Sequence, residues 1–255
     1  MNASREPVGR SDAERRARID LAACHRLAAR FGFSEGIDNH MTMLVPGHSE
    51  RFYLAPFGLL WSEVKASDLL ELDFSGTVVA GRGLVEDTAL YIHLSVHRLM
   101  PQARCVLHTH MPHATALGML EDPRLDMAAQ NAIGFHDDIA YVDYQGLALD
   151  YAEGERLARA LGSKSVLMLR NHGVLVTAGS AAQAFERLYF LERACQAQVL
   201  ALSTGRKLRI VAEAVVQATV AQFRAGDKVG GQDRTELHFA ALKRLLDRSE
   251  ADYAS

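Results

Sequence analysis

One short segment constrains the fold of this chain more than any other. Residues 105–110 read CVLHTH, an apolar run that ends in two histidines one residue apart. Side chains of a β-strand alternate between the two faces of a sheet, so His108 and His110 point the same way. A third histidine, His172, stands in an RNHG turn between two further apolar runs. Three neutral imidazoles that leave one coordination position open are the usual arrangement of a catalytic divalent metal, although a His-x-His pair alone also suits an exposed strand.

The rest of the chain alternates short apolar runs with longer amphipathic segments. This mixture predicts an α/β fold with helices on both faces of a mixed sheet. Ser11 and Glu14 form a capping box before the first expected helix, and Ser75-Gly76 between two apolar runs predicts a hairpin. Helices are expected over residues 11–31, 86–100, 112–120, 152–161, 180–203 and 213–247, and strands over residues 41–45, 51–55, 69–74, 77–79, 104–107, 139–142, 166–169 and 174–177.

Composition is that of an ordinary globular protein of 255 residues, 49% hydrophobic and 23% charged. This length suits one domain, with residues 1–10 disordered and residues 213–255 as a C-terminal helical extension. A net charge of −3 without a basic cluster argues against nucleic-acid binding. No apolar run approaches the ~20 residues of a membrane span, and residues 1–18 lack the apolar core of a secretory signal. The three scattered cysteines suit a reducing compartment, so we expect a cytoplasmic protein.

Four segments, in this order along the chain, resemble the class II aldolase/adducin family. They are the loop GFSEGIDNH at residues 32–40, the strand and turn FYLAPFG at residues 52–58, the strand ending in His-x-His at residues 104–110, and the Asn-His-Gly turn at residues 171–173. The resemblance implies a three-layer α/β/α class II aldolase-like fold with a central mixed, largely antiparallel sheet.

The same resemblance implies a metal and an oligomer. In the aldolases of the family three such histidines hold zinc or a similar ion, which implies one divalent metal per subunit on His108, His110 and His172. We expect Zn²⁺ first, with Mn²⁺, Fe²⁺ or Co²⁺ as alternatives, because imidazoles accept all of them. The family's enzymes are usually tetramers, so a homotetramer is expected. Adducin heads are cytoskeletal and lack the metal histidines, so their retention here favours chemistry over scaffolding.

Two departures separate the chain from the family's sugar-phosphate aldolases. Those enzymes carry a Ser-Ser-Glu segment whose serines hold phosphate and whose glutamate transfers a proton. Here Ala89 falls at the glutamate position, with Glu86 one helical turn earlier, and the Thr-Pro-Thr-Gly turn reads APFG at residues 55–58. A phosphate needs hydroxyls, backbone N–H groups and cations, whereas Phe57 and Trp61 suit an apolar or aromatic group. The segment is closer to adducin heads and to bacterial paralogues, some of which decarboxylate hydroxylated ring acids with a divalent metal.

Three side chains are candidates for proton transfer. Tyr144 loosely matches a tyrosine that assists from a neighbouring subunit in family aldolases, and Tyr141 is close enough to be confused with it. His40 could bind a carboxylate or move a proton. Glu86 could act as an acid or base or as a fourth ligand, and could equally be an ordinary acid at a helix N-terminus.

Substrate contacts are expected from Asn39, Phe57, Trp61 and Arg170. Asn39 lies in the loop where family aldolases bind substrate, although such a residue can also simply hold the backbone. Arg170 could bind a carboxylate through two hydrogen bonds, or could be an ordinary surface cation. Packing or hydrogen bonding, rather than metal binding, is expected for His93 and His97. His113 is expected to cap the helix that starts there rather than to touch substrate.

Together these expectations describe a divalent-metal-dependent carbon–carbon lyase, either a decarboxylase or a retro-aldolase. The ion would stabilise the enolate that remains when a neighbouring C–C bond breaks. The substrate would be a small, carboxylated or hydroxylated molecule without phosphate. Two alternatives stay open: a sugar-phosphate aldolase or epimerase, and a non-catalytic, adducin-like oligomeric binding module.

Overall fold

The computed structural model describes residues 11–226 and 228–255, so the disorder expected for residues 1–10 falls outside the described part. Its centre is an eight-stranded sheet in the order β4-β3-β2-β1-β5-β8-β7-β6. Every neighbouring pair in this sheet is antiparallel except β6 and β7, which confirms the mixed, largely antiparallel sheet. The strands are β1 (His40–Leu44), β2 (Arg51–Leu54), β3 (Leu70–Asp73), β4 (Val78–Ala80), β5 (Cys105–Thr109), β6 (Ile139–Val142), β7 (Val166–Leu169) and β8 (Gly173–Ala178).

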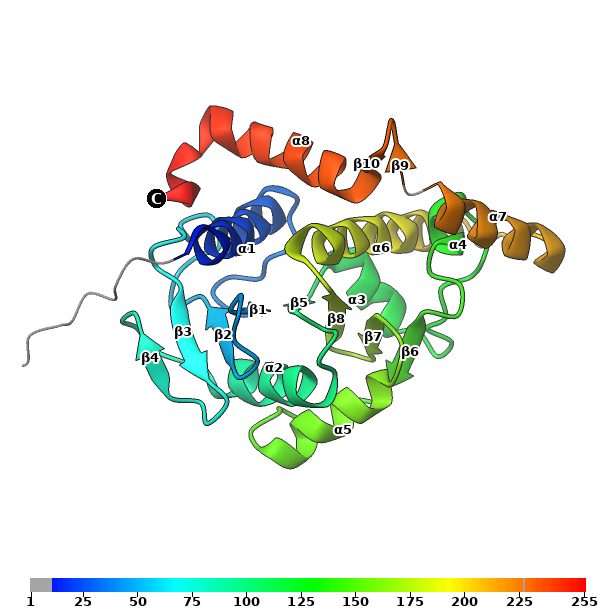
Figure 1. Ribbon diagram of the computed structural model, residues 1–255. Coiled ribbons are helices and arrows are strands. Elements are labelled where there is room, and N and C mark those ends of the chain that lie inside the picture. Colours follow the sequence, from blue (N-terminus) through cyan, green and yellow to red (C-terminus); the bar gives the residue numbers. More distant parts are fainter. Residues whose placement is uncertain (1–10, 227) are drawn as a thin grey trace, which may run out of the picture.

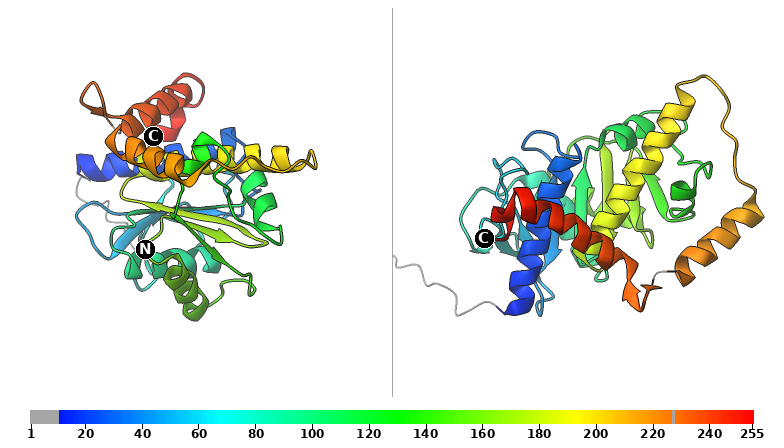
Figure 2. Two further views of the ribbon diagram at one scale, coloured as in Figure 1. Left: turned by 90° about the vertical axis from the view of Figure 1, so that its right-hand side faces the viewer. Right: turned by 90° about the horizontal axis from the view of Figure 1, so that it is seen from above.

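Helices cover both faces of the sheet and complete three layers (Figure 1). Seen edge-on, the sheet lies between α1, α6 and α8 on one side and α2 and α5 on the other (Figure 2). The central strands β5 and β8 are buried at every position, as expected for strands that are covered on both faces. Within residues 11–226 and 228–255 no helix is both long and apolar enough to cross a membrane. The helices are α1 (Asp12–Arg30), α2 (Asp87–Leu99), α3 (Pro112–Gly118), α4 (Gln130–Ile133), α5 (Tyr151–Leu161), α6 (Ala181–Leu202), α7 (Glu213–Ala225) and α8 (Arg234–Ser249).

Two local signals of the sequence are confirmed. Ser11 accepts a hydrogen bond from the backbone N–H of Glu14, whose carboxylate accepts one from the backbone N–H of Ser11, so α1 begins with a capping box. Gly76 takes a φ of +85° in the turn between β3 and β4, a conformation that costs glycine little.

The continuous helix expected over residues 213–247 is wrong. A short hairpin, β9 (Lys228–Val229) and β10 (Gln232–Asp233), separates α7 from α8. Gly230 and Gly231 both adopt positive φ in its two-residue turn, the conformation that hairpins of this length favour. Asp233 then caps α8 by accepting hydrogen bonds from the first-turn backbone N–H groups. The short helix α4 was also not expected from the sequence.

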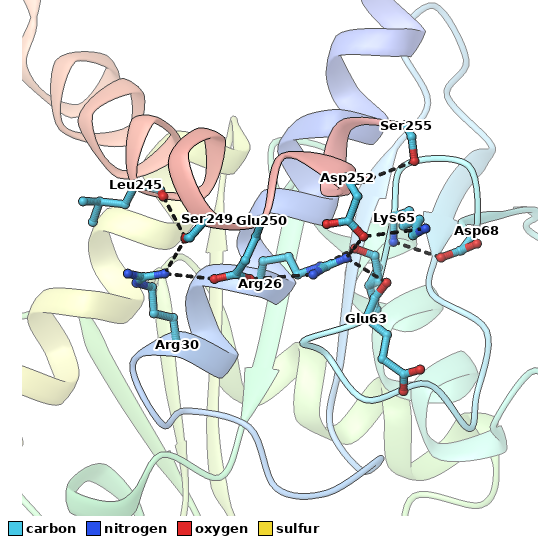
Figure 3. Close-up of polar contacts among 11 residues, drawn as sticks. Arg26, Arg30, Glu63, Lys65, Asp68, Leu245, Ser249, Glu250, Asp252 and Ser255 are labelled. Atoms are coloured by element: carbon cyan, nitrogen blue, oxygen red, sulfur yellow. Dashed lines mark hydrogen bonds and ion pairs between the residues drawn. The ribbon is translucent and has the colours of Figure 1, made fainter.

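The segment after α8 is anchored to α1 through the buried side chain of Arg26 (Figure 3). Its guanidinium donates hydrogen bonds to the carboxylate of Asp252 at 2.9 Å and to the backbone carbonyl of Val64 at 2.9 Å. Val64 lies in the same loop as Trp61, between β2 and β3. Arg26 therefore connects α1, the C-terminal segment and the loop that carries Trp61.

Candidate metal centre

The structure brings His108, His110 and His172 together. His108 lies within β5, His110 follows directly after its end, and His172 lies in the turn between β7 and β8. Because β5 pairs with β8, the turn that carries His172 reaches the end of β5. Their ring centroids are 4.7 to 5.0 Å apart, and one ring nitrogen from each lies within 4.8 Å of the others.

The donor set fits a divalent metal. The Nδ1–H of His108 donates to the backbone carbonyl of Val174 at 2.9 Å, which leaves its Nε2 with a free lone pair. Nδ1 of His110 contacts the carboxylate of Glu35, and its buried Nε2 makes no hydrogen bond within the described part of the chain. Such outer partners fix the tautomer and ring orientation of metal-binding histidines. Burial lowers the pKa of His172 to about 4, so the neutral, ligating form prevails at pH 7.

Local backbone geometry positions two histidines, His40 after Asn39 and His172 after Asn171. Asn39 and Asn171 both adopt positive φ, +76° and +58°, a region that asparagine tolerates better than most residues. Each immediately precedes a histidine of the site, so the chain turns sharply there. Gly173 is required by a close approach, since a Cβ at that position would lie 2.5 Å from the carbonyl oxygen of Thr109 and 2.8 Å from Cδ2 of His110.

The three histidines line a cavity of about 320 Å³. Of the residues predicted from the sequence, Asn39, His40, Phe57, Trp61 and Glu86 also line it. Phe57 and the almost fully buried Trp61 add two aromatic side chains to this lining. None of the described residues lining this cavity is a lysine or an arginine, so the cavity offers a phosphate no cation of this chain.

Asn39 does two things at once. Its side-chain oxygen accepts a hydrogen bond from the backbone N–H of His110 at 3.3 Å, which is the backbone-holding role considered for it. Its amide Nδ2 is buried and has no hydrogen-bond partner among the described residues. A buried donor without a partner is costly, and here it belongs to a residue that lines the cavity, where a ligand oxygen could accept from it.

Glu86 caps α2. Its carboxylate accepts hydrogen bonds from the backbone N–H groups of Thr88 at 3.0 Å and Ala89 at 2.8 Å, and from the hydroxyl of Thr88. The capping interpretation of this acid therefore has direct structural support. Ala89, at the position where the resemblance places the family's glutamate, also lines the cavity and brings no titratable group.

The two tyrosines considered for proton transfer differ in environment. The hydroxyl of Tyr141 accepts the backbone N–H of Leu125 at 3.0 Å and serves the fold. Tyr144 is half exposed and its ring centroid lies 5.9 Å from that of His172 in the same chain. Tyr144 is outside the main cavity and lines a small neighbouring one that shares His172.

Arg170 is not at the site, contrary to its predicted role in substrate binding. Its guanidinium donates to the carboxylate of Asp143 at 2.9 Å and to the backbone carbonyl of Glu121 at 3.3 Å. It does not appear among the described residues that line the cavity. Arg170 lies two residues before His172, and the tight turn with its left-handed Asn171 leaves its guanidinium against Asp143 rather than at the cavity.

His40 stands against the metal histidines, with its ring centroid 4.8 Å from that of His108. Its Nδ1 lies 2.7 Å from Nε2 of His93, and both His93 and His97 contact the hydroxyl of Thr42, at 2.6 and 2.8 Å. The hydrogen-bonding role expected for His93 and His97 is thereby confirmed. The structural role expected for His113 is confirmed as well, since its backbone N–H and its ring both bond one buried carboxylate, that of Glu192.

Two residues at the site, His25 and Glu35, were not predicted from the sequence. His25, on α1, is fully buried and lines the cavity, and its ring packs edge-on to Trp61 at 5.2 Å. Its Nδ1–H donates to the backbone carbonyl of Leu21 at 2.8 Å, and its Nε2 has no partner within the described residues. Glu35 is a mostly exposed loop acid. His25 lies within the first expected helix and Glu35 within the loop motif at residues 32–40, but spacing alone does not single either of them out.

With the geometry established, comparisons with known proteins identify the family. A family model described as the class II aldolase and adducin N-terminal domain matches residues 19–199. The "Putative aldolase class 2 protein" of Caulobacter vibrioides is 36% identical over 247 residues, which cover 96% of this chain and 94% of that protein. Alpha-adducin of Mus musculus is 36% identical over 92% of this chain, which corresponds to 33% of the adducin.

A solved structure agrees with these matches. The crystal structure of an aldolase II superfamily protein from Pseudomonas syringae superposes with a TM-score of 0.89 at 36% identity and covers 96% of this chain and 98% of that one. The chain therefore belongs to the class II aldolase and adducin family. The resemblance seen in its sequence and the three-layer α/β fold expected from it are both confirmed.

Proposed function

We propose that this protein is a divalent-metal-dependent carbon–carbon lyase that acts on a small, carboxylated or hydroxylated substrate without phosphate. The observation that carries the proposal is the cluster His108, His110 and His172 in the lining of a cavity that also contains Phe57 and Trp61. Three imidazoles leave a divalent ion with an open position for substrate. A purely structural site would be closed by a fourth protein ligand.

His108, His110 and His172 would hold the ion, with Zn²⁺ expected first and Mn²⁺, Fe²⁺ or Co²⁺ as alternatives. When bound, it supplies a Lewis acid that stabilises the enolate left by cleavage of a neighbouring C–C bond. The chain contributes the outer shell: Glu35 and the Val174 carbonyl orient the rings of His110 and His108.

Other residues around the histidines position the substrate and move protons. The unpartnered Nδ2 of Asn39 donates to a substrate oxygen beside the histidines. His40 and Tyr144 are the proposed proton-transfer groups, because both lie against metal histidines. Glu86, the third candidate, is assigned mainly to capping because its carboxylate already accepts three hydrogen bonds.

The aromatic side chains of Phe57 and Trp61 determine the proposed substrate class. They suit the apolar or aromatic body of a ring acid, while the polar side chains of the same lining suit its carboxylate and hydroxyl groups. The absence of Lys and Arg from the described cavity lining counts against a sugar phosphate, whose dianion needs cations and hydroxyls. Decarboxylation and retro-aldol cleavage share the enolate, so both reactions are to be assayed.

Metal content, measured by mass spectrometry on protein purified without a histidine tag, is the first test. We expect near-stoichiometric divalent metal in the wild type and its loss in His108→Ala. The metal-loaded protein should then turn over hydroxylated ring acids or hydroxy acids and leave fuculose and ribulose phosphates nearly untouched. Fast cleavage of those phosphates would overturn the proposed substrate class.

A second candidate is a non-catalytic, adducin-like binding module, and the match to alpha-adducin of Mus musculus favours it. Wild-type protein that holds no metal even after incubation with Zn²⁺ or Mn²⁺ would select this alternative.

For either function we propose a single-domain, cytoplasmic homotetramer. Light scattering coupled to size-exclusion chromatography tests the tetramer, which a mass near 28 kDa, that of one chain, would exclude.

A further inference from the structure

We propose that a buried chain of hydrogen bonds through His97, Thr42 and His93 fixes the tautomer of His40, so that His40 carries its proton on Nδ1 and presents the lone pair of Nε2 to the cavity. His97, Thr42 and His93 are then positioning residues, and His40 is the group they position. The use of that lone pair in catalysis rests on the proposed function, whereas the order of protons along the chain does not.

The order begins at a group that can only accept. Nδ1 of His97 lies 2.8 Å from the backbone carbonyl oxygen of Ala103. A carbonyl has no proton to give, so Nδ1 of His97 must carry one. Burial lowers the pKa of His97 to about 4, so at pH 7 the ring is neutral and its Nε2 is left as an acceptor.

Thr42 passes this order on. Its hydroxyl lies 2.8 Å from Nε2 of His97 and 2.6 Å from Nδ1 of His93. A hydroxyl has one proton, and His97 takes it because its Nε2 can only accept. The Thr42 oxygen must then accept from His93, so the proton of His93 is on Nδ1 and its Nε2 is a free acceptor.

The last bond transfers the order to the cavity. Nε2 of His93 lies 2.7 Å from Nδ1 of His40, so Nδ1 of His40 donates and its Nε2 keeps a lone pair. The nearest hydroxyl to this Nε2, that of Thr88 at 3.5 Å, donates its only proton to the carboxylate of Glu86. The lone pair of His40 therefore remains available in the cavity that His40 lines.

Burial makes the order stable. Thr42 and His93 are fully buried and His97 is 2% exposed, so no solvent can replace a missing partner along the chain. Reversing the chain would place two lone pairs against each other, at Nδ1 of His97 and the carbonyl oxygen of Ala103, and would leave both unsatisfied in the interior. Only one arrangement of protons satisfies every group.

A lone pair held in this position can accept a hydrogen bond from a substrate hydroxyl and is placed to take its proton. In a retro-aldol step, Nε2 of His40 would take the hydroxyl proton. The O–H electron pair would form the new carbonyl, and the pair of the breaking C–C bond would pass to the enolate. Atoms and charge balance without any further reactant.

The direct test is nitrogen NMR of protein labelled with ¹⁵N-histidine, because long-range ¹H–¹⁵N correlations distinguish protonated from unprotonated ring nitrogens. We expect His40, His93 and His97 each to be protonated on Nδ1 alone at pH 7. Each signal is assigned with a variant in which one histidine is replaced. A proton on Nε2 of any of the three, or on both nitrogens, would overturn the proposal.

Variants of Thr42 test the central link. Thr42→Val keeps the side-chain shape but removes the hydroxyl, so His40 should become a mixture of both tautomers, while Thr42→Ser should restore the single form. Thr177→Val is the matched control, because Thr177 is also a buried strand threonine but lies outside the chain of bonds. Single-tautomer His40 in Thr42→Val would refute the positioning role.

Turnover gives a second reading that separates this proposal from the proposed function. For a substrate that the wild type cleaves, Thr42→Val should lower kcat about tenfold with little change in KM, and Thr177→Val should change neither. If the wild type lacks lyase activity but shows the predicted tautomers, the proposed function fails and the ordered chain stands. If the tautomers differ while the enzyme is active, the ordered chain fails alone.

Discussion

Glu35 accepts a hydrogen bond from Nδ1 of His110, and this contact ties the loop after α1 to the end of β5. The two residues are 75 positions apart in the sequence. The bond leaves Nε2 of His110 free toward His108 and His172. An exposed loop acid thus controls the orientation of a ring at the centre of the site.

Glu35→Gln should weaken metal binding about tenfold, because a carboxylate partner increases the basicity of a ligating imidazole and holds its ring in place. Competition between the protein and a chromogenic zinc chelator measures the change. Glu155→Gln is the control, since Glu155 pairs with Arg159 on the exposed face of α5. Equal affinity of Glu35→Gln and wild type would show that Glu35 does not contribute to the site.

Gly173→Ala should lower both metal affinity and stability. The added methyl would meet the carbonyl oxygen of Thr109 and the ring of His110 well inside contact distance, which forces backbone and ring apart at a cost of roughly 1–3 kcal/mol. Gly179→Ala, in the next loop, is the control, because its Cβ would meet only the end of the Gln183 side chain at 3.3 Å. Metal content and urea unfolding of both variants decide the matter; an unaffected Gly173→Ala would contradict the close approach.

Strands of the site were predictable because their signals are local. Residues 105–107 and 166–169 are apolar runs, and the structure contains β5 and β7 there. The convergence of His108 and His110 follows from strand geometry alone. The prediction of one continuous helix over residues 213–247 was wrong, because Gly230 and Gly231 form a hairpin turn. The helical pattern on either side of this turn obscured it.

The residues that local signals missed depend on long-range pairing. Thr42 reaches His93 and His97 only because β1 lies beside β5 and under α2, and nothing within β1 indicates that neighbour. Arg170, in contrast, was predicted to contact substrate and lies away from the cavity. Its place two residues before His172 suggested a substrate contact, but the geometry of one turn decides where its side chain points.

Glu86→Ala should lower the free energy of unfolding by about 1 kcal/mol, whereas Glu86→Asp should remain close to wild type. The reason is that Glu86 satisfies two N–H groups at the start of α2, and aspartate is an equally good or better N-cap, while alanine is a poor one. Urea unfolding of the two variants gives the comparison. An alanine variant as stable as wild type would show that the capping contacts add nothing, and would return Glu86 to the candidates for proton transfer.

His97 should make stability depend on pH. Burial lowers its pKa in the folded protein to about 4, below the ordinary value of 6.5, so as the pH falls the unfolded chain takes up this proton first. Stability is therefore complete above pH 6.5 and is lost as the pH falls from 6.5 towards 4, by about 2 kcal/mol between pH 7 and pH 5.

His97→Gln should remove that share of the pH dependence, because an amide can still bond Thr42 and the Ala103 carbonyl but does not titrate. Urea unfolding at pH 7 and pH 5 gives the difference for each protein. The exposed His48 provides the control: His48→Gln should keep the full wild-type difference, since its ring meets solvent in both states. Burial also lowers the pKa of His25 to about 4. Because of such other buried histidines, the stability of His97→Gln should still depend on pH, but less than that of the wild type. If His97→Gln loses as much stability as wild type on acidification, His97 is not held neutral in the folded protein, and the ordered chain that begins at the Ala103 carbonyl loses its starting point.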